Sequence, residues 1–150
     1  MKRLKKLANF TLHDQQKYVE VWKGFGYDLD PTPRAPLIQF EKGTWTEEMI
    51  LNAVMDSMRK ILDEGFEAII IGGLSNCMAY AWYVANMFGL EVVMARTPRV
   101  RDEVTGKPIF VMTGVSKLLT ASEVATRVLK IIDTRLRLRS ATRPWRSNQD

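Results

Sequence analysis

The residues best suited to binding chemistry gather in three segments, each of which directly follows an apolar, β-branched stretch. These segments are Gly72-Gly73-Leu74-Ser75-Asn76, a polar stretch that starts at Arg96, and Thr113-Gly114-Val115-Ser116-Lys117. Together they offer backbone N–H groups at a helix start, hydroxyl groups and cations, which are the donors that bind phosphate. We therefore predict a site for a phosphate-bearing small ligand, a nucleotide or a nucleotide-derived signal, with or without catalysis. The predicted ligand-binding residues are Gly72, Gly73, Ser75, Asn76, Arg96, Thr113, Ser116 and Lys117.

Two features of this region have a structural alternative. A glycine pair after a strand can bring an anion close to the backbone, or it can simply let a helix pack closely on a strand. Cys77 lies at the predicted start of a helix, where its pKa could fall and make the thiol nucleophilic. It could equally be a small buried residue, as free cysteines often are. The sequence leaves both questions open, and we assign no catalytic residue.

Several enzyme classes are excluded by missing residues. Gly106-Lys107 is followed by proline and lacks the upstream glycine of a phosphate-binding Walker loop. The stretch from Gly73 to Cys77 lacks the last glycine of a nucleophile elbow, and the only histidine, His13, precedes the serine rather than following it. One cysteine and one histidine without suitably spaced carboxylates predict no metal site, and we predict no cofactor.

Positive charge is concentrated at the two ends of the chain. Residues 1–6 contain four basic side chains and no acidic one, and residues 127–150 contain seven basic side chains against two acidic ones. Residues 7–126 carry more acidic than basic side chains, although the whole chain has a net charge of +5. The ends therefore predict an alternative function, a nucleic-acid-binding or assembly-associated accessory protein of the kind that viruses encode. The predicted contacts are Arg135, Arg137, Arg139, Arg143 and Arg146, unless this tail is simply solvated.

Hydrophobic periodicity predicts the elements that position these residues. Capping-box spacing, Thr44 to Glu47 and Thr120 to Glu123, marks two helix starts. Strands alternating with helices favour a partly parallel sheet. We predict an α/β fold, with a small Rossmann-like sheet of about four strands flanked by helices and an N-terminal helical arm. The expected strands cover residues 37–41, 67–71, 90–95 and 109–113, and the expected helices cover residues 12–23, 46–63, 75–88 and 121–138.

Composition bounds the organisation and the setting of the protein. We predict a basic, helical N-terminal arm with a proline-rich connector over 1–36, a core domain over 37–138 and a basic tail over 139–150. A single cysteine is typical of a reducing compartment, and no apolar run is long enough to cross a membrane, so we expect a cytoplasmic protein with no membrane partner. The predicted helix around 78–88 is apolar on nearly every side, which favours a homo-oligomer.

The stretch from Ile69 to Arg96, IIIGGLSNCMAYAWYVANMFGLEVVMAR, resembles the Rossmann-like nucleotide-binding proteins of the SLOG group. Those proteins also place a Gly-Gly loop after a strand, then a helix and a second strand. The same region looks similar to small viral α/β proteins that bind cyclic nucleotides. Both resemblances imply a Rossmann-like sheet and a nucleotide ligand at the loop that begins at Gly72.

Overall fold

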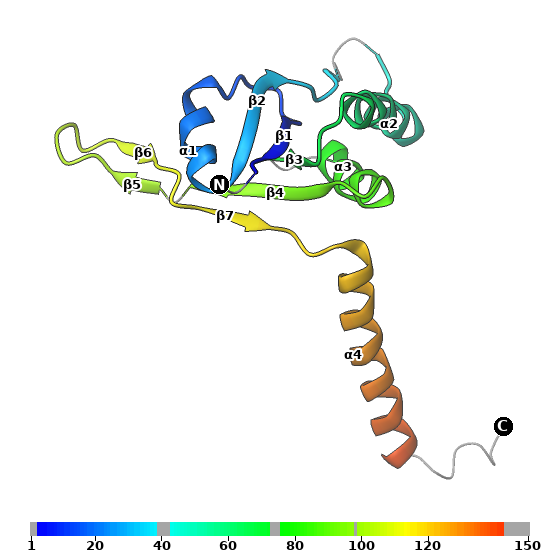
Figure 1. The fold of residues 1–150 in the computed structure, drawn as a ribbon. Helices are drawn as coiled ribbons and strands as arrows, with labels where there is room; N and C mark the ends of the chain where they lie inside the picture. Colours follow the sequence, from blue (N-terminus) through cyan, green and yellow to red (C-terminus); the bar gives the residue numbers. More distant parts are fainter. Residues whose placement is uncertain (1–2, 39–42, 73–75, 98, 143–150) are drawn as a thin grey trace. The chain divides into compact units, whose positions relative to one another are not determined.

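The computed structural model describes residues 3–38, 43–72, 76–97 and 99–142. The chain divides into two compact units, one spanning Met1–Leu118 and the other Leu119–Asp150. We call them the sheet unit and the C-terminal unit and describe each by itself. Figure 1 gives the elements of both units.

The sheet unit is built on a five-stranded sheet with the strand order β2-β1-β3-β4-β7. Its first four strands run parallel and β7 pairs antiparallel with β4. The predicted class, an α/β protein with a small, partly parallel sheet, is confirmed. The strands are β1 (Lys5–Asn9), β2 (Tyr27–Pro33), β3 (Ala68–Ile70), β4 (Glu91–Arg96) and β7 (Gly114–Lys117), and β5 (Arg99–Arg101) pairs with β6 (Pro108–Phe110) in a separate hairpin.

The parallel strands are doubly wound. From β1 the chain passes through a short 3₁₀ turn, η1 (Gln16–Tyr18), and α1 (Val19–Gly24) to β2 on one side. It then crosses through α2 (Glu47–Asp63) to β3 on the other side of β1, and through α3 (Asn76–Met87) to β4 (Figure 1). The winding direction therefore reverses between β1 and β3. In such sheets this reversal opens a crevice at the carboxyl ends of the two strands.

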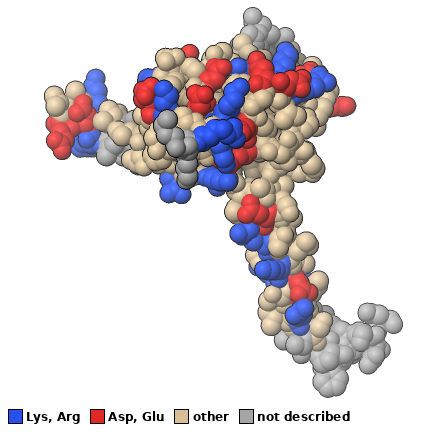
Figure 2. Space-filling model, viewed as in Figure 1, with Lys and Arg blue, Asp and Glu red and all other residues tan. Residues whose placement is uncertain are grey.

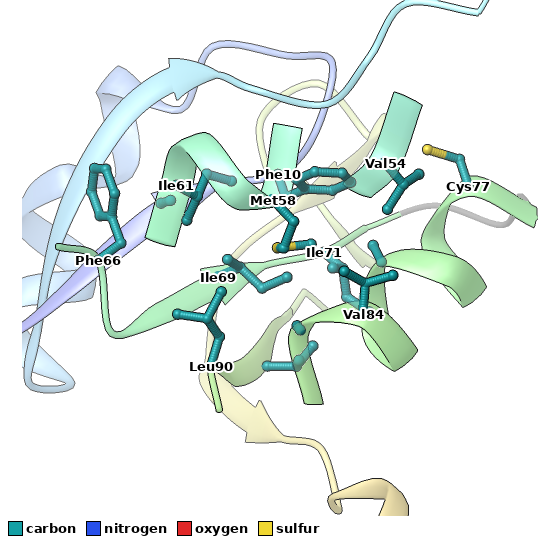
Figure 3. Close-up of a cluster of buried hydrophobic side chains, with 14 of the residues drawn as sticks. Phe10, Val54, Met58, Ile61, Phe66, Ile69, Ile71, Cys77, Val84 and Leu90 are labelled. Carbon is teal, nitrogen blue, oxygen red and sulfur yellow. The ribbon is translucent and has the colours of Figure 1, made fainter. Parts of the chain in front are cut away.

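Alternating side chains divide the core into one cluster on each face of the sheet. Ala8, Ile69 and Val92 point to the face that α2 and α3 cover, and Figure 3 shows Ile69 and Ile71 packed between those helices. Leu7, Ile70 and Val93 point to the opposite face, where Trp22 is the buried residue of α1. One face is thus covered by two long helices and the other by a helix of only six residues.

The helix boundaries follow local chemistry that the sequence largely indicates. The capping residue of α2 is Thr46, two residues after the predicted Thr44, and its side chain accepts a hydrogen bond from the Met49 N–H at 3.1 Å. Gly65 then ends this helix with φ +82°, a conformation that favours glycine. In the C-terminal unit, the predicted box is confirmed, since Thr120 and Glu123 exchange hydrogen bonds of 2.9 and 3.1 Å.

The N-terminal region differs from the prediction. Residues 5–9 form a central strand and residues 27–33 an edge strand, although we expected a helical arm and a proline-rich connector. The prolines at 31 and 33 led us to expect a connector, but β2 lies at the sheet edge, where a missing backbone N–H costs little. Of the strand predicted at 37–41, residues 37 and 38 are irregular and the others lie outside the described residues.

Within its described residues, which end at residue 142, the C-terminal unit contains one helix, α4 (Ala121–Thr142). The predicted helix over 121–138 is confirmed and extends four residues further. Its apolar residues Val124, Val128 and Ile131 recur at spacings of four and three, which places them on one side of the helix. No helix in the described part of the chain is both long and apolar enough to span a membrane.

Candidate functional site

A cavity of about 410 Å³ opens at the carboxyl ends of the parallel strands. Three of its walls come from chain segments that leave these strands. Thr11 follows β1, Ile71 and Gly72 follow β3, and Thr97 follows β4. β1 and β3 are the strands between which the winding direction reverses, so the cavity lies where doubly wound sheets bind ligands.

The cavity exists because one face of the sheet is incompletely covered. Gln15, Tyr18 and Trp22, from the segment leading through η1 and α1, form one wall. Met94 and Ala95 of β4 and Met112, which precedes β7, form the opposite wall. α1 is only six residues long, and Trp22 is its buried residue.

The wall of the cavity is neutral. Its polar side chains are Thr11, Gln15, Tyr18 and Thr97, Trp22 also lines it, and no charged residue lines it among the described residues. The remaining wall is apolar and aromatic. Burying an unpaired charge against such a wall would cost several kcal/mol, whereas a flat, uncharged ring would fit.

Buried polar side chains fix the loop between β1 and the cavity. Asn9 is fully buried, and its Nδ2 donates to the carbonyl oxygens of His13 and Pro31, each at 2.8 Å. Its Oδ1 accepts a 2.6 Å hydrogen bond from Thr11 Oγ1. This network ties the end of β1 to β2 and holds Thr11 at the cavity wall. The loop is thus positioned by hydrogen bonds rather than by packing alone.

The structure brings some of the predicted ligand-binding residues together. Gly72 lines the cavity. Thr97, which directly follows Arg96 in the chain, lines it as well. The exposed Arg96 donates through Nε to Ser116 Oγ at 2.7 Å, and its carbonyl oxygen accepts from the Thr113 N–H at 2.8 Å. Arg96, Thr113 and Ser116 therefore share the end of the β4–β7 pair. Gly73 and Ser75 lie outside the described residues.

Lys117 lies elsewhere. It pairs with Val93 in the sheet, and its Nζ is 3.0 Å from Glu91 Oε2, where β4 begins. Glu91 also accepts from Lys5 Nζ at 2.7 Å and from the hydroxyl of Tyr27. Although burial opposes ionisation, these donors hold the pKa of Glu91 below its ordinary value. This cluster belongs to the amino end of the parallel strands, opposite the cavity.

Asn76 and Cys77 are engaged at the start of α3. The Asn76 side chain donates to both carboxylate oxygens of Glu47, at 2.9 and 2.8 Å, and thereby links the first turns of α2 and α3. Figure 3 shows Cys77 at the edge of the core cluster, facing Val54. Burial raises the pKa of the Cys77 thiol. The structure therefore favours the buried, inert alternative for this cysteine over the activated thiolate.

The N-terminal basic residues contact the sheet unit itself. Arg3 pairs with Glu67 at 2.5 Å, Lys5 pairs with Glu91, and Lys6 Nζ donates to the Glu64 carbonyl oxygen at 3.3 Å. Figure 2 accordingly shows basic and acidic side chains interspersed over the visible face of this unit. Within the described residues, basic side chains also cluster on α4. One of them, Arg137, pairs with Asp133 at 3.1 Å. Arg143 and Arg146 lie outside the described residues.

Comparison with known proteins adds no family to this geometry. No protein-family model matches the chain, and no curated protein matches it. What the structure supports is a Rossmann-like, mostly parallel α/β sheet. Within the described residues, no three histidine, cysteine, aspartate or glutamate side chains gather as metal ligands would.

Three residues of the cavity wall were not predicted as site residues. Gln15, Tyr18 and Trp22 fell in a segment that we took for a peripheral helix. The signal that could have found them is the stretch Leu7–Phe10, apolar except for Asn9, which is followed by Thr11 and then by a short amphipathic segment. That pattern is typical of a strand and its crossover. The basic residues on either side of Leu4 concealed it.

Proposed function

We propose that the protein binds a nucleotide or a similar small ligand in which a flat, uncharged ring is joined to a phosphate. The observation that carries this proposal is the neutral, aromatic-lined cavity at the point where the winding direction of the sheet reverses. Its volume of about 410 Å³ lies within the range of small-molecule sites. The resemblance of Ile69–Arg96 to the SLOG group supports the same ligand class.

The division of polarity supports an orientation for the ligand. The ring would occupy the cavity because its wall carries no charge within the described residues. The phosphate would remain outside, near Arg96, whose guanidinium would donate charge-assisted hydrogen bonds to it. Arg96 is suited to this role because it is exposed at the end of β4, one residue before Thr97 of the cavity wall.

Calorimetric titration with AMP, GMP, CMP, UMP and the corresponding nucleosides tests this proposal. We expect at least one nucleotide to bind and its nucleoside to bind more weakly. Arg96→Ala should weaken the nucleotide about tenfold, as loss of a charge-assisted hydrogen bond predicts, and leave the nucleoside unchanged. Arg59→Ala is the matched control, because Arg59 is an exposed arginine of α2 that pairs with Asp56. No binding by the unsubstituted protein, or an undiminished affinity in Arg96→Ala, would overturn the proposal.

A second candidate function rests on α4. Its described residues carry Arg127, Lys130, Arg135, Arg137 and Arg139 against Glu123 and Asp133, so this helix has the charge of a nucleic-acid-binding segment. The N-terminal basic residues contribute less, since they pair within the sheet unit. Affinity for DNA or RNA should fall steeply with salt and disappear when residues 135–150 are removed. Binding that is independent of salt concentration, or that persists after this truncation, would exclude nucleic-acid binding through α4.

A further inference from the structure

The indole of Trp22 is a wall of the cavity with an unusual property. Its ring is fully buried, edge-on to Tyr27 with the ring centres 5.6 Å apart. Its Nε1–H has no hydrogen-bond acceptor, and Arg34 Nε is the other buried side-chain nitrogen without a partner among the described residues. A buried donor without an acceptor is destabilising, so natural proteins rarely leave one without a reason.

The neighbours of Trp22 explain what kind of acceptor could satisfy it. Ile70 and Ala95 supply apolar contacts in the same cluster, and Tyr18 and Met112 pack against it. All four line the cavity together with Trp22, and none of them accepts a hydrogen bond from Nε1. A molecule that enters the cavity would supply such an acceptor.

We infer that Trp22 Nε1 is the donor that recognises the ring of the ligand, through a ring nitrogen or a carbonyl oxygen at its edge. This inference rests on the proposed function and names the part of the ligand that specificity depends on. A planar heteroaromatic ring fits because the cavity wall is apolar and aromatic, while the ring edge supplies the acceptor that Trp22 lacks. An aliphatic ligand would leave the N–H unpaired and bind less well.

Two methionines of the cavity wall are suited to move when a ligand enters. Trp22 has no exposed surface, so a ligand reaches Nε1 only after a side chain at the cavity wall moves. Met94 and Met112 both line the cavity and are partly buried, and methionine changes rotamer at low cost. Entry of the ring would displace one of these side chains rather than the backbone.

The test replaces the N–H without changing the shape of the ring. In one variant, 3-benzothienylalanine is incorporated at position 22, so that sulfur takes the place of the indole N–H. The second variant is Trp22→Phe, and Trp82→Phe is the control because Trp82 does not line the cavity. For each variant, affinities for AMP, GMP, CMP and UMP are measured by calorimetry, and the thermal midpoint is measured without ligand.

We expect the benzothiophene variant to lose about five- to tenfold in affinity for every nucleotide that the unsubstituted protein binds. Its thermal midpoint without ligand should stay equal or rise, because an unpaired buried donor has been removed. Unchanged affinity would overturn the inference and leave the proposed function intact. A lower midpoint without ligand would also overturn it, since that result means the N–H has a partner within the protein. If none of the four nucleotides binds the unsubstituted protein, the proposed function fails and this inference fails with it.

Discussion

The carboxylate of Glu91 makes a quantitative prediction about stability. It joins four of the five strands, because Lys5 lies on β1, Tyr27 on β2 and Lys117 on β7. Its side chain is only 11% exposed, whereas Lys5 and Lys117 are 49% and 64% exposed. The two lysine contacts are therefore largely screened, and each is worth about 0.2–1 kcal/mol. The partly buried hydrogen bond from Tyr27 is worth about 1.5–3 kcal/mol, as for a charged acceptor.

Glu91→Gln keeps the shape and an acceptor for the Tyr27 hydroxyl but removes the charge. We expect a loss of about 2 kcal/mol in the free energy of unfolding, which corresponds to about 8 °C in the thermal midpoint for a chain of this size. Urea denaturation and differential scanning calorimetry measure both quantities. Asp56→Asn is the matched control, because the Asp56–Arg59 pair joins side chains that are 67% and 68% exposed. This control should change stability by no more than about 0.5 kcal/mol.

The pH dependence supplies the refuting result. The pKa of Glu91 is lowered in the folded protein, so the unfolded chain takes up the proton first as the pH falls. The stabilisation is complete above the ordinary carboxyl pKa of 4.5 and is lost as the pH falls through the lower, folded value. The difference between the unsubstituted protein and Glu91→Gln should shrink over that window. A difference that equals the Asp56→Asn control, or that persists unchanged at low pH, would refute the reasoning.

Two further predictions concern the backbone and the thiol. Gly26 has φ +94°, so Gly26→Ala should destabilise the protein by about 1 kcal/mol or more in urea denaturation. Gly24 lies within α1, and a Cβ added there meets no atom within 4 Å, so Gly24→Ala should be neutral or stabilising. Equal effects at both positions would contradict the conformational argument. Cys77 is buried and the pKa of its thiol is raised, so the thiol should react with a disulfide reagent slowly in the folded protein and rapidly in urea. Fast reaction without denaturant would contradict this prediction and show that the start of α3 opens readily.

The middle of the fold was predictable because its signals are local. α2 is amphipathic and is followed by a glycine with positive φ, and β3 is a short apolar run between Gly65 and Gly72. These patterns depend on neighbouring residues, and the bounds of both elements agree with the predicted ones to within one residue. α4 was predictable for the same reason, since Thr120 and Glu123 cap it through their own side chains.

The N-terminal strands were not predictable in the same way because they depend on distant partners. Lys5 and Lys6 are exposed on β1, yet their charges are balanced by Glu91 and by the carbonyl oxygen of Glu64, far along the chain. The candidate site shows the same limit. Gly72 and Arg96 could be selected by residue type, but the contribution of Trp22 depends on a crossover that only the folded sheet brings beside β4.

The cavity wall is assembled from stretches that are far apart along the chain, at residues 11–22, 70–72, 94–97 and 112. Unfolding separates these stretches, so a ligand of this cavity has affinity for the native state and none for the denatured chain. Ligand binding and folding are therefore thermodynamically linked, and the free energy of unfolding should rise by RT ln(1 + [L]/Kd). At a hundredfold excess over Kd this gain is about 2.7 kcal/mol, larger than the loss expected from Glu91→Gln. A true ligand should thus restore the midpoint of that variant, although it binds at the opposite end of the strands.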